Sequence, residues 1–177
     1  MKANLIILII ITFYSCQLSS EKNNIQQMIQ EWQGKEIQLP SGTIEYKIMG
    51  RDTSCFELWN KPFKIFTFID SVGCTSCRLG LPQWKEVIES SIGQLLNVSF
   101  IFIINSSDYE MLEHFVIAHD FNYPLIYDYQ NEFDRLNHFA QIPYRTFLLD
   151  KDNKVLLIGS PIDNPKMWEL YLKVISR

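Results

Sequence analysis

The chain has 177 residues and a formal net charge of −4, with 47% hydrophobic and 20% charged residues. This composition excludes a disordered, collagen-like or low-complexity chain, and the length predicts one globular domain with its own hydrophobic core. The slight acidity and the absence of a basic run argue against nucleic acid as a partner and against a polybasic membrane patch. The four cysteines are too few for a disulfide scaffold, so their positions matter more than their number.

The first residues are typical of an export signal. Lys2 gives a short positive region, residues 5–14 are a largely apolar run, and Ser15 is a small residue directly before Cys16. This run is too short to cross about 30 Å of hydrocarbon as a helix. A cysteine at this position resembles the lipobox of bacterial lipoproteins, which predicts a signal peptide over residues 1–15 and lipidation of Cys16. An uncleaved anchor and a plain secretory signal with an incidental Cys16 are the alternatives.

After Cys16, residues 16–24 are polar enough to serve as a tether, and residues 25–177 are assigned to one domain. Hydrophobic residues recur at helical spacing from Ile25 to Trp32, which predicts a short helix. Apolar residues then alternate with polar ones at 37–39 and 44–48, on either side of a turn signal at Pro40-Ser41-Gly42. This pattern predicts a β-hairpin that precedes the main fold.

The remaining chain alternates strands and helices. Nearly continuous apolar runs predict buried central strands at residues 65–69, 98–104, 125–127 and 147–149, the last followed by a strand at 155–158. Helical periodicity occurs at residues 77–91, 108–119, 131–139 and 164–175, and Asp108, Asn131 and Asn164 are the expected N-caps. Residues 150–153 are typical of a tight turn. The order βαβαβββα, without an internal repeat, predicts a single α/β domain.

The most informative motif is Cys74-Thr75-Ser76-Cys77. It follows a predicted buried strand and opens a predicted helix, so Cys74 is expected at a helix N-terminus, where backbone N–H groups and the helix dipole stabilise a thiolate. Cys74 would attack a disulfide, and Cys77, one helical turn on, would resolve the mixed disulfide. A structural disulfide, half of a zinc site and two core thiols are the alternatives, although neither a second CxxC nor paired histidines supply further zinc ligands.

The motif and its surroundings resemble a known family. With Pro82 five residues after Cys77, the motif resembles the CxxC helix of thioredoxins, especially the TlpA-like membrane-anchored thioredoxins of bacterial envelopes. Residues 146–155, TFLLDKDNKV, resemble the closing hairpin of that family. The resemblance covers residues 35–177. It implies a thioredoxin-like fold with a central mixed sheet flanked by helices, thiol-disulfide oxidoreductase activity, and no bound metal or organic cofactor.

Two positions depart from the family pattern. The tryptophan that usually precedes the first cysteine is Gly73, and the position of the family's cis-proline, two residues before Thr146, is Tyr144. Pro143 lies one residue earlier, so either a bulge brings it into place or it is an ordinary loop proline. The resemblance implies that the substrate-binding residues are Gly73, Thr75, Ser76, Pro143 and Tyr144.

Cysteine, aspartate and histidine side chains outside the motif could also carry chemistry. Cys55 is expected to be a buried, inert thiol, with a regulatory thiol or a third redox partner as alternatives. Asp70 lies four residues before Cys74 and could transfer protons, although a turn or capping role fits it equally well. Surface or packing roles are expected for His114, His119 and His138.

These patterns predict a lipid-anchored thiol-disulfide oxidoreductase of the bacterial cell envelope, exposed to the periplasm or the cell surface. Its partners would be protein thiols or disulfides, a further redox protein, and the membrane through Cys16. The main alternative is a non-enzymatic lipoprotein that binds another envelope component and whose CxxC is a static or vestigial disulfide. A peroxidase of the same superfold is a third interpretation, but Ser71 stands where those sites carry threonine.

Overall fold

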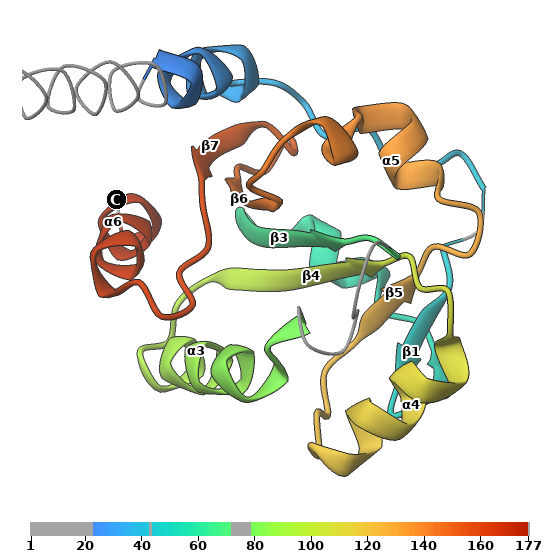
Figure 1. Ribbon diagram of the computed structural model, residues 1–177. Coiled ribbons are helices and arrows are strands. Elements are labelled where there is room, and N and C mark those ends of the chain that lie inside the picture. The colour runs from blue at the N-terminus through green and yellow to red at the C-terminus, as the bar shows by residue number, and fades with distance from the viewer. Residues whose placement is uncertain (1–22, 43, 72–78, 177) are drawn as a thin grey trace, which may run out of the picture. The chain divides into compact units, whose positions relative to one another are not determined.

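The computed structural model describes residues 23–42, 44–71 and 79–176 (Figure 1). The chain divides into two units, residues 1–33 and 34–177. In the first unit, residues 23–32 are helical, which confirms the helix predicted from Ile25 to Trp32. The predicted signal peptide, the lipidation site Cys16 and the CxxC motif lie outside the described residues.

A mixed sheet forms the centre of the second unit. Within the described residues it has seven strands in the order β2-β1-β5-β4-β3-β6-β7. The central strands β3, β4 and β5 are parallel, whereas β6 runs antiparallel to β3 and β1 runs antiparallel to β5. The strands are β1 (Tyr46–Ile48), β2 (Arg51–Thr53), β3 (Phe63–Ile69), β4 (Val98–Ile104), β5 (Leu125–Tyr127), β6 (Thr146–Leu149) and β7 (Val155–Ile158).

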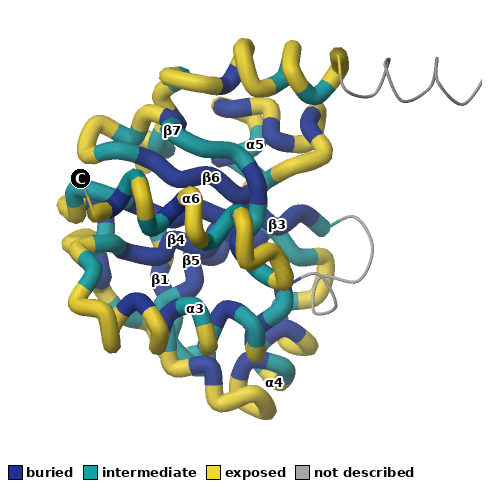
Figure 2. Tube along the Cα trace, turned by 90° about the vertical axis from the view of Figure 1, so that its left-hand side faces the viewer, coloured by how far each residue is buried: buried dark blue, intermediate teal, exposed yellow. Residues whose placement is uncertain are grey.

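Helices cover both faces of this sheet. On one face, α3, α4 and α6 pack their apolar side chains against Ile65, Phe102 and their neighbours. On the other face, η1 and α5 contribute Trp59 and Phe133, whose rings stack against each other next to Phe66. Strands β3, β4, β5 and β6 are almost entirely buried, whereas Figure 2 shows β7 as largely intermediate and much of the helices as exposed. The helices are η1 (Phe56–Asn60), α3 (Leu81–Gly93), α4 (Tyr109–Ala118), α5 (Glu132–Asn137), η2 (Phe139–Gln141) and α6 (Pro165–Ile175).

Two of the three predicted N-caps make capping hydrogen bonds. The Asp108 carboxylate accepts a hydrogen bond from Met111 N at 2.8 Å, and Asn164 Oδ1 accepts one from Met167 N at 3.2 Å. Asn131 occupies the N-cap position of α5 but makes no capping bond, since its backbone is left-handed. Both oxygens of Asp128 instead accept from the first amides of α5, at 2.8 and 2.9 Å. Asn131 is therefore the N-cap by position, as predicted, but Asp128 makes the capping hydrogen bonds.

The predicted helix from Cys77 to Ser91 is interrupted. Leu79 is helical, but Gly80 has a left-handed backbone with φ of 58°, and α3 begins at Leu81. Pro82 lies in the first turn of α3, where its missing N–H costs nothing, whereas inside a continuous helix it would remove a hydrogen bond and its ring would clash with the preceding turn. The proline therefore lies at the start of α3, directly after the break at Gly80.

The predicted hairpin of residues 37–39 with 44–48 was also wrong. Strand β1 pairs with β2, and Met49 and Gly50 form the turn with φ of 52° and 76°. Positive φ at both positions is the geometry of the two-residue turns that join antiparallel strands. The hairpin is part of the sheet, because Tyr46 in β1 also pairs with Ile126 in β5. Alternation in the sequence identified β1 but could not identify its partner.

The segment expected to pair with β1 is held by Asn137 instead. The Asn137 side chain is almost fully buried; its Oδ1 accepts from Gln38 N at 2.8 Å, and its Nδ2 donates to Gln38 O and Phe133 O at 2.9 Å. One buried amide therefore joins this segment to α5.

Replacing Asn137 with alanine should lower the free energy of unfolding by about 2–4 kcal/mol, because two part-buried hydrogen bonds to Gln38 and one buried hydrogen bond to Phe133 O are lost together. Urea unfolding followed by tryptophan fluorescence measures the change. The matched control is Asn122→Ala at an exposed position, which should change the free energy of unfolding by less than about 0.5 kcal/mol. Equal effects of the two substitutions would contradict this role of Asn137.

Candidate functional site

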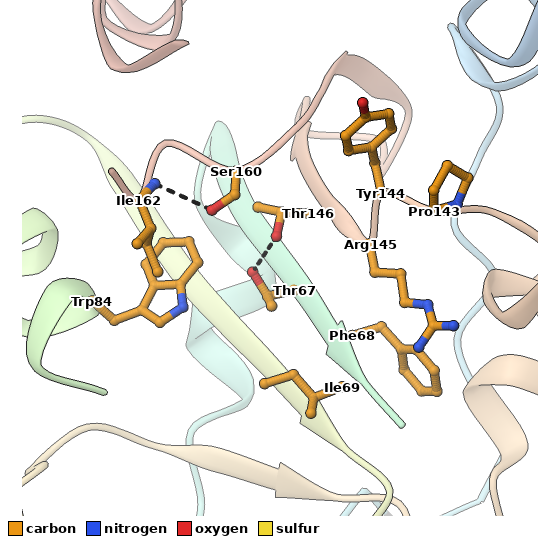
Figure 3. A pocket seen from close by; sticks show the side chains of 10 residues that line it. All are labelled: Thr67, Phe68, Ile69, Trp84, Pro143, Tyr144, Arg145, Thr146, Ser160 and Ile162. Carbon is orange, nitrogen blue, oxygen red and sulfur yellow. Dashed lines mark hydrogen bonds between the residues drawn. The ribbon is translucent and has the colours of Figure 1, made fainter. Parts of the chain in front are cut away.

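A pocket of about 220 Å³ lies where β3 ends and β6 begins (Figure 3). Its walls come from β3, α3, the segment that leads into β6, and the loop after β7. They are formed by residues 67–69, Trp84, residues 143–146, Ser160 and Ile162. The predicted substrate-binding residues Pro143 and Tyr144 are therefore at this pocket, whereas Cys74, Cys77, Gly73, Thr75 and Ser76 lie outside the described residues.

The pairing of β3 with β6 fixes the floor of the pocket. Thr67 lies opposite Thr146, and their hydroxyls are 3.2 Å apart. Figure 3 shows the two side chains facing each other. One residue further, Phe68 N donates to Arg145 O at 2.9 Å, so the pairing continues past the end of β6. On the other side of β3, Asn105 N donates to Ile69 O at 2.8 Å. The backbone that enters the CxxC segment is thus held on both sides.

An ion pair joins the same two segments. The Arg145 guanidinium binds the carboxylate of Asp70, the first residue after β3. The two side chains are 17% and 9% exposed, so this is a partly buried contact and not a surface pair. Proton transfer, a turn or a cap was expected of Asp70, and its partner Arg145 was not predicted. The available signal was a charged residue at the boundary of each of two apolar strands.

Pro143 lines the pocket and follows a trans peptide bond. The described residues contain no cis peptide bond, so the Ile142–Pro143 bond is trans. Ile142 is buried beneath this segment, and the Tyr144 side chain beside Pro143 is 42% exposed. Tyr144 is therefore accessible to a molecule that enters the pocket.

The wall opposite Arg145 is apolar. Trp84 is 2% exposed, and its ring packs edge-on against Phe102 at a centroid distance of 5.2 Å. The Ser160 hydroxyl accepts a hydrogen bond from Ile162 N at 3.1 Å, which fixes the loop that closes this side. The described lining residues thus form an aromatic and aliphatic wall with a few hydroxyls, which can accommodate an amino-acid side chain.

Cys55 is a buried free thiol away from this pocket. Its sulfur lies 3.9 Å from Thr53 Oγ1, directly before η1. Nearby, the Tyr46 hydroxyl accepts a hydrogen bond from Trp59 Nε1 at 2.8 Å, and burial raises the pKa of Tyr46. The expected burial of Cys55 is confirmed, and its chemical inertness stays a prediction.

The three histidines, for which surface or packing roles were expected, are exposed. His119 packs on Phe115 at a ring-centroid distance of 4.1 Å, which is a packing contact. Among the described residues, no group of three His, Cys, Asp or Glu side chains is arranged to hold a metal ion. No helix in residues 23–42, 44–71 and 79–176 has both the length and the apolar character needed to cross a bilayer.

The chain matches no protein-family model and no curated protein. Solved structures do resemble it. StoA from Bacillus subtilis is 22% identical with a TM-score of 0.53, over 74% of this chain and 98% of StoA. The thioredoxin domain of a thiol-disulfide oxidoreductase from Bacteroides vulgatus is 12% identical with a TM-score of 0.57, over 81% and 97%. Thioredoxin from Wuchereria bancrofti is 18% identical with a TM-score of 0.51, over 75% and 96%. The chain therefore has a thioredoxin-like fold.

Proposed function

We propose that the protein is a thiol-disulfide oxidoreductase that uses Cys74 and Cys77. The main support is the pocket at the end of β3, because the chain leaves this strand at Asp70 and the CxxC begins four residues later. Leu79, two residues after Cys77, is fully buried in the core. In the sequence, the CxxC motif therefore lies between two buried residues, Asp70 and Leu79. Asp70 contacts Arg145, which lines the pocket.

The proposed reaction balances without a cofactor. The Cys74 thiolate attacks a substrate disulfide, forms a mixed disulfide and releases one substrate thiolate. The Cys77 thiolate then attacks the Cys74 sulfur, which releases the second substrate thiolate and leaves a Cys74–Cys77 disulfide. The substrate gains two electrons that the dithiol loses, and the reverse sequence oxidises a dithiol. Gly73, Thr75, Ser76, Pro143 and Tyr144 are proposed to contact the substrate.

The proposed setting is the cell envelope. Acylation of Cys16 would attach the protein to a membrane, with residues 16–24 as a tether, and the domain would exchange thiols with envelope proteins and with a further redox partner. Two acyl chains give stable anchoring where one chain gives only reversible binding. StoA and the Bacteroides vulgatus oxidoreductase support the redox assignment through their fold. The alternative is a binding module with a static disulfide, which the displaced proline favours.

Trapping distinguishes the enzyme from the binding module. In the Cys77→Ser variant the mixed disulfide on Cys74 cannot be resolved, so covalent complexes with protein substrates should accumulate in envelope extracts and disappear on reduction. Non-reducing electrophoresis followed by mass spectrometry measures them. The Cys74→Ser variant is the matched control and should form none. Equal capture by both variants, or by neither, would remove the support for an oxidoreductase.

A further inference from the structure

We propose that the Asp70–Arg145 ion pair sets the specificity of the pocket, so that it accepts uncharged side chains from a peptide segment next to the reacting cysteine. This inference rests on the proposed function, because it assigns the pocket to the substrate of that reaction. It concerns which substrates bind, and the residues that determine it all belong to the described part of the chain.

The charge balance of the pocket depends on this pair. Among the described residues that line the pocket, Arg145 is the one with a formal charge at neutral pH. Its guanidinium is paired with the Asp70 carboxylate, and the two side chains are 17% and 9% exposed. Together they carry no net charge. The other walls consist of aromatic and aliphatic side chains and hydroxyls.

Backbone pairing holds the two charges in place. Arg145 O accepts from Phe68 N at 2.9 Å, and the neighbouring Thr67 and Thr146 hydroxyls are 3.2 Å apart. Asp70 and Arg145 therefore start from two chain segments in fixed register, unlike a pair of mobile surface side chains. A preformed, partly buried pair of this kind keeps its geometry when a ligand arrives.

A neutral pocket discriminates against charge. A carboxylate or ammonium entering about 220 Å³ of aromatic and aliphatic wall would lose hydration, and the described lining residues offer it no counter-charge outside the Asp70–Arg145 pair. An uncharged aliphatic or aromatic side chain loses little hydration free energy and gains contacts with Trp84 and Ile162. The ligand class that fits is a peptide or unfolded-protein segment with such a residue beside its cysteine.

Three peptides test this specificity. Each has one cysteine as a 2-pyridyl disulfide, flanked on both sides by leucine, glutamate or lysine, and each reacts with the reduced protein under single-turnover conditions. Release of 2-thiopyridone gives the second-order rate constant. Wild type should react with the leucine peptide at least about tenfold faster than with either charged peptide, a discrimination equivalent to about 1.4 kcal/mol.

Charge variants should change the ratio of the glutamate rate to the lysine rate. Asp70→Asn removes the negative charge of the pair and leaves a net charge of +1, so the ratio should rise about tenfold. Arg145→Gln removes the positive charge and leaves a net charge of −1, so the ratio should fall. The neutral double variant should return toward wild type. Because both peptides react with the same protein, changes in thiol reactivity or in the folded fraction cancel. Asp152→Asn, in the exposed turn after β6, makes the same change in net charge and should leave the ratio within twofold.

The outcomes separate the two proposals. An unchanged ratio in Asp70→Asn, with wild type reactive, overturns the specificity and leaves the function standing; Asp70→Asn suffices where Arg145→Gln does not fold. If wild type reacts with no peptide faster than Cys74→Ser does, the oxidoreductase function fails. In that case calorimetry measures the binding of the same peptides with serine in place of cysteine. The ratio of the affinity for the glutamate peptide to the affinity for the lysine peptide then tests the selectivity of the pocket.

Discussion

Replacing Cys74 with serine should lower the rate of disulfide reduction by at least about 10³-fold, because removal of a catalytic nucleophile leaves only the background reaction. A serine hydroxyl cannot replace a thiolate in exchange with a disulfide, and Cys77 is expected to face away from a protein substrate. Cys77→Ser should behave differently, with a fast first step and no second turnover. A continuous assay with a peptide disulfide, combined with a single-turnover measurement, resolves the two steps.

Cys55→Ala is the matched cysteine control. Cys55 is a buried free thiol beside Thr53, outside the residues that line the pocket, so its replacement should leave the rate of folded protein within about twofold of wild type. A Cys74→Ser protein that keeps more than a tenth of the wild-type rate would contradict the assignment of the nucleophile. Loss of exchange in Cys55→Ala would show instead that Cys55 takes part in the redox chemistry.

Replacing Phe66 with alanine should lower the free energy of unfolding by about 3–5 kcal/mol, the cost of removing a buried aromatic ring and leaving a cavity. Phe66 is fully buried in β3. Its ring lies 5.3 Å from that of Phe139 and 6.1 Å from that of Phe147, and Trp59 and Phe133 complete the cluster. Urea unfolding measures the change in free energy and its denaturant dependence.

Phe56→Ala is the control for ring loss. The Phe56 side chain is 59% exposed, so its removal should cost less than about 1 kcal/mol. If Phe66→Ala lowers the free energy of unfolding by less than about 1 kcal/mol, this face of the sheet is not stabilised by the aromatic cluster of Trp59, Phe66, Phe133, Phe139 and Phe147.

The central strands could be predicted because a strand that is buried on both faces of the sheet is a nearly continuous apolar run in the sequence. Residues 98–104 and 125–127 were predicted with the bounds that β4 and β5 have. A continuous apolar run of this kind has few competing interpretations when turns and helical patterns flank it. The confirmed caps at Asp108 and Asn164 are equally local, since each side chain binds an amide three residues away.

The features that were missed depend on contacts between distant residues. The pairing of β1 with β2 and β5, and the binding of Gln38 to Asn137, could not be read from alternation within residues 37–48. Asp128 caps α5 through a turn whose geometry places Asn131 in the left-handed region. The Asp70–Arg145 pair joins residues 75 positions apart, so neither residue carries a local pattern that reveals the other.

Titration of the reduced protein against glutathione redox buffers, with alkylation and mass spectrometry to count free thiols, tests the proposed function most directly. Cys74 and Cys77 should lose their free thiols together in a single two-electron transition, while Cys55 stays reduced in the folded protein. Either cysteine replaced by serine should abolish this transition. A Cys74–Cys77 disulfide that exchanges with glutathione only after unfolding, or two thiols that never pair, would contradict a redox-active dithiol and leave a binding module in its place.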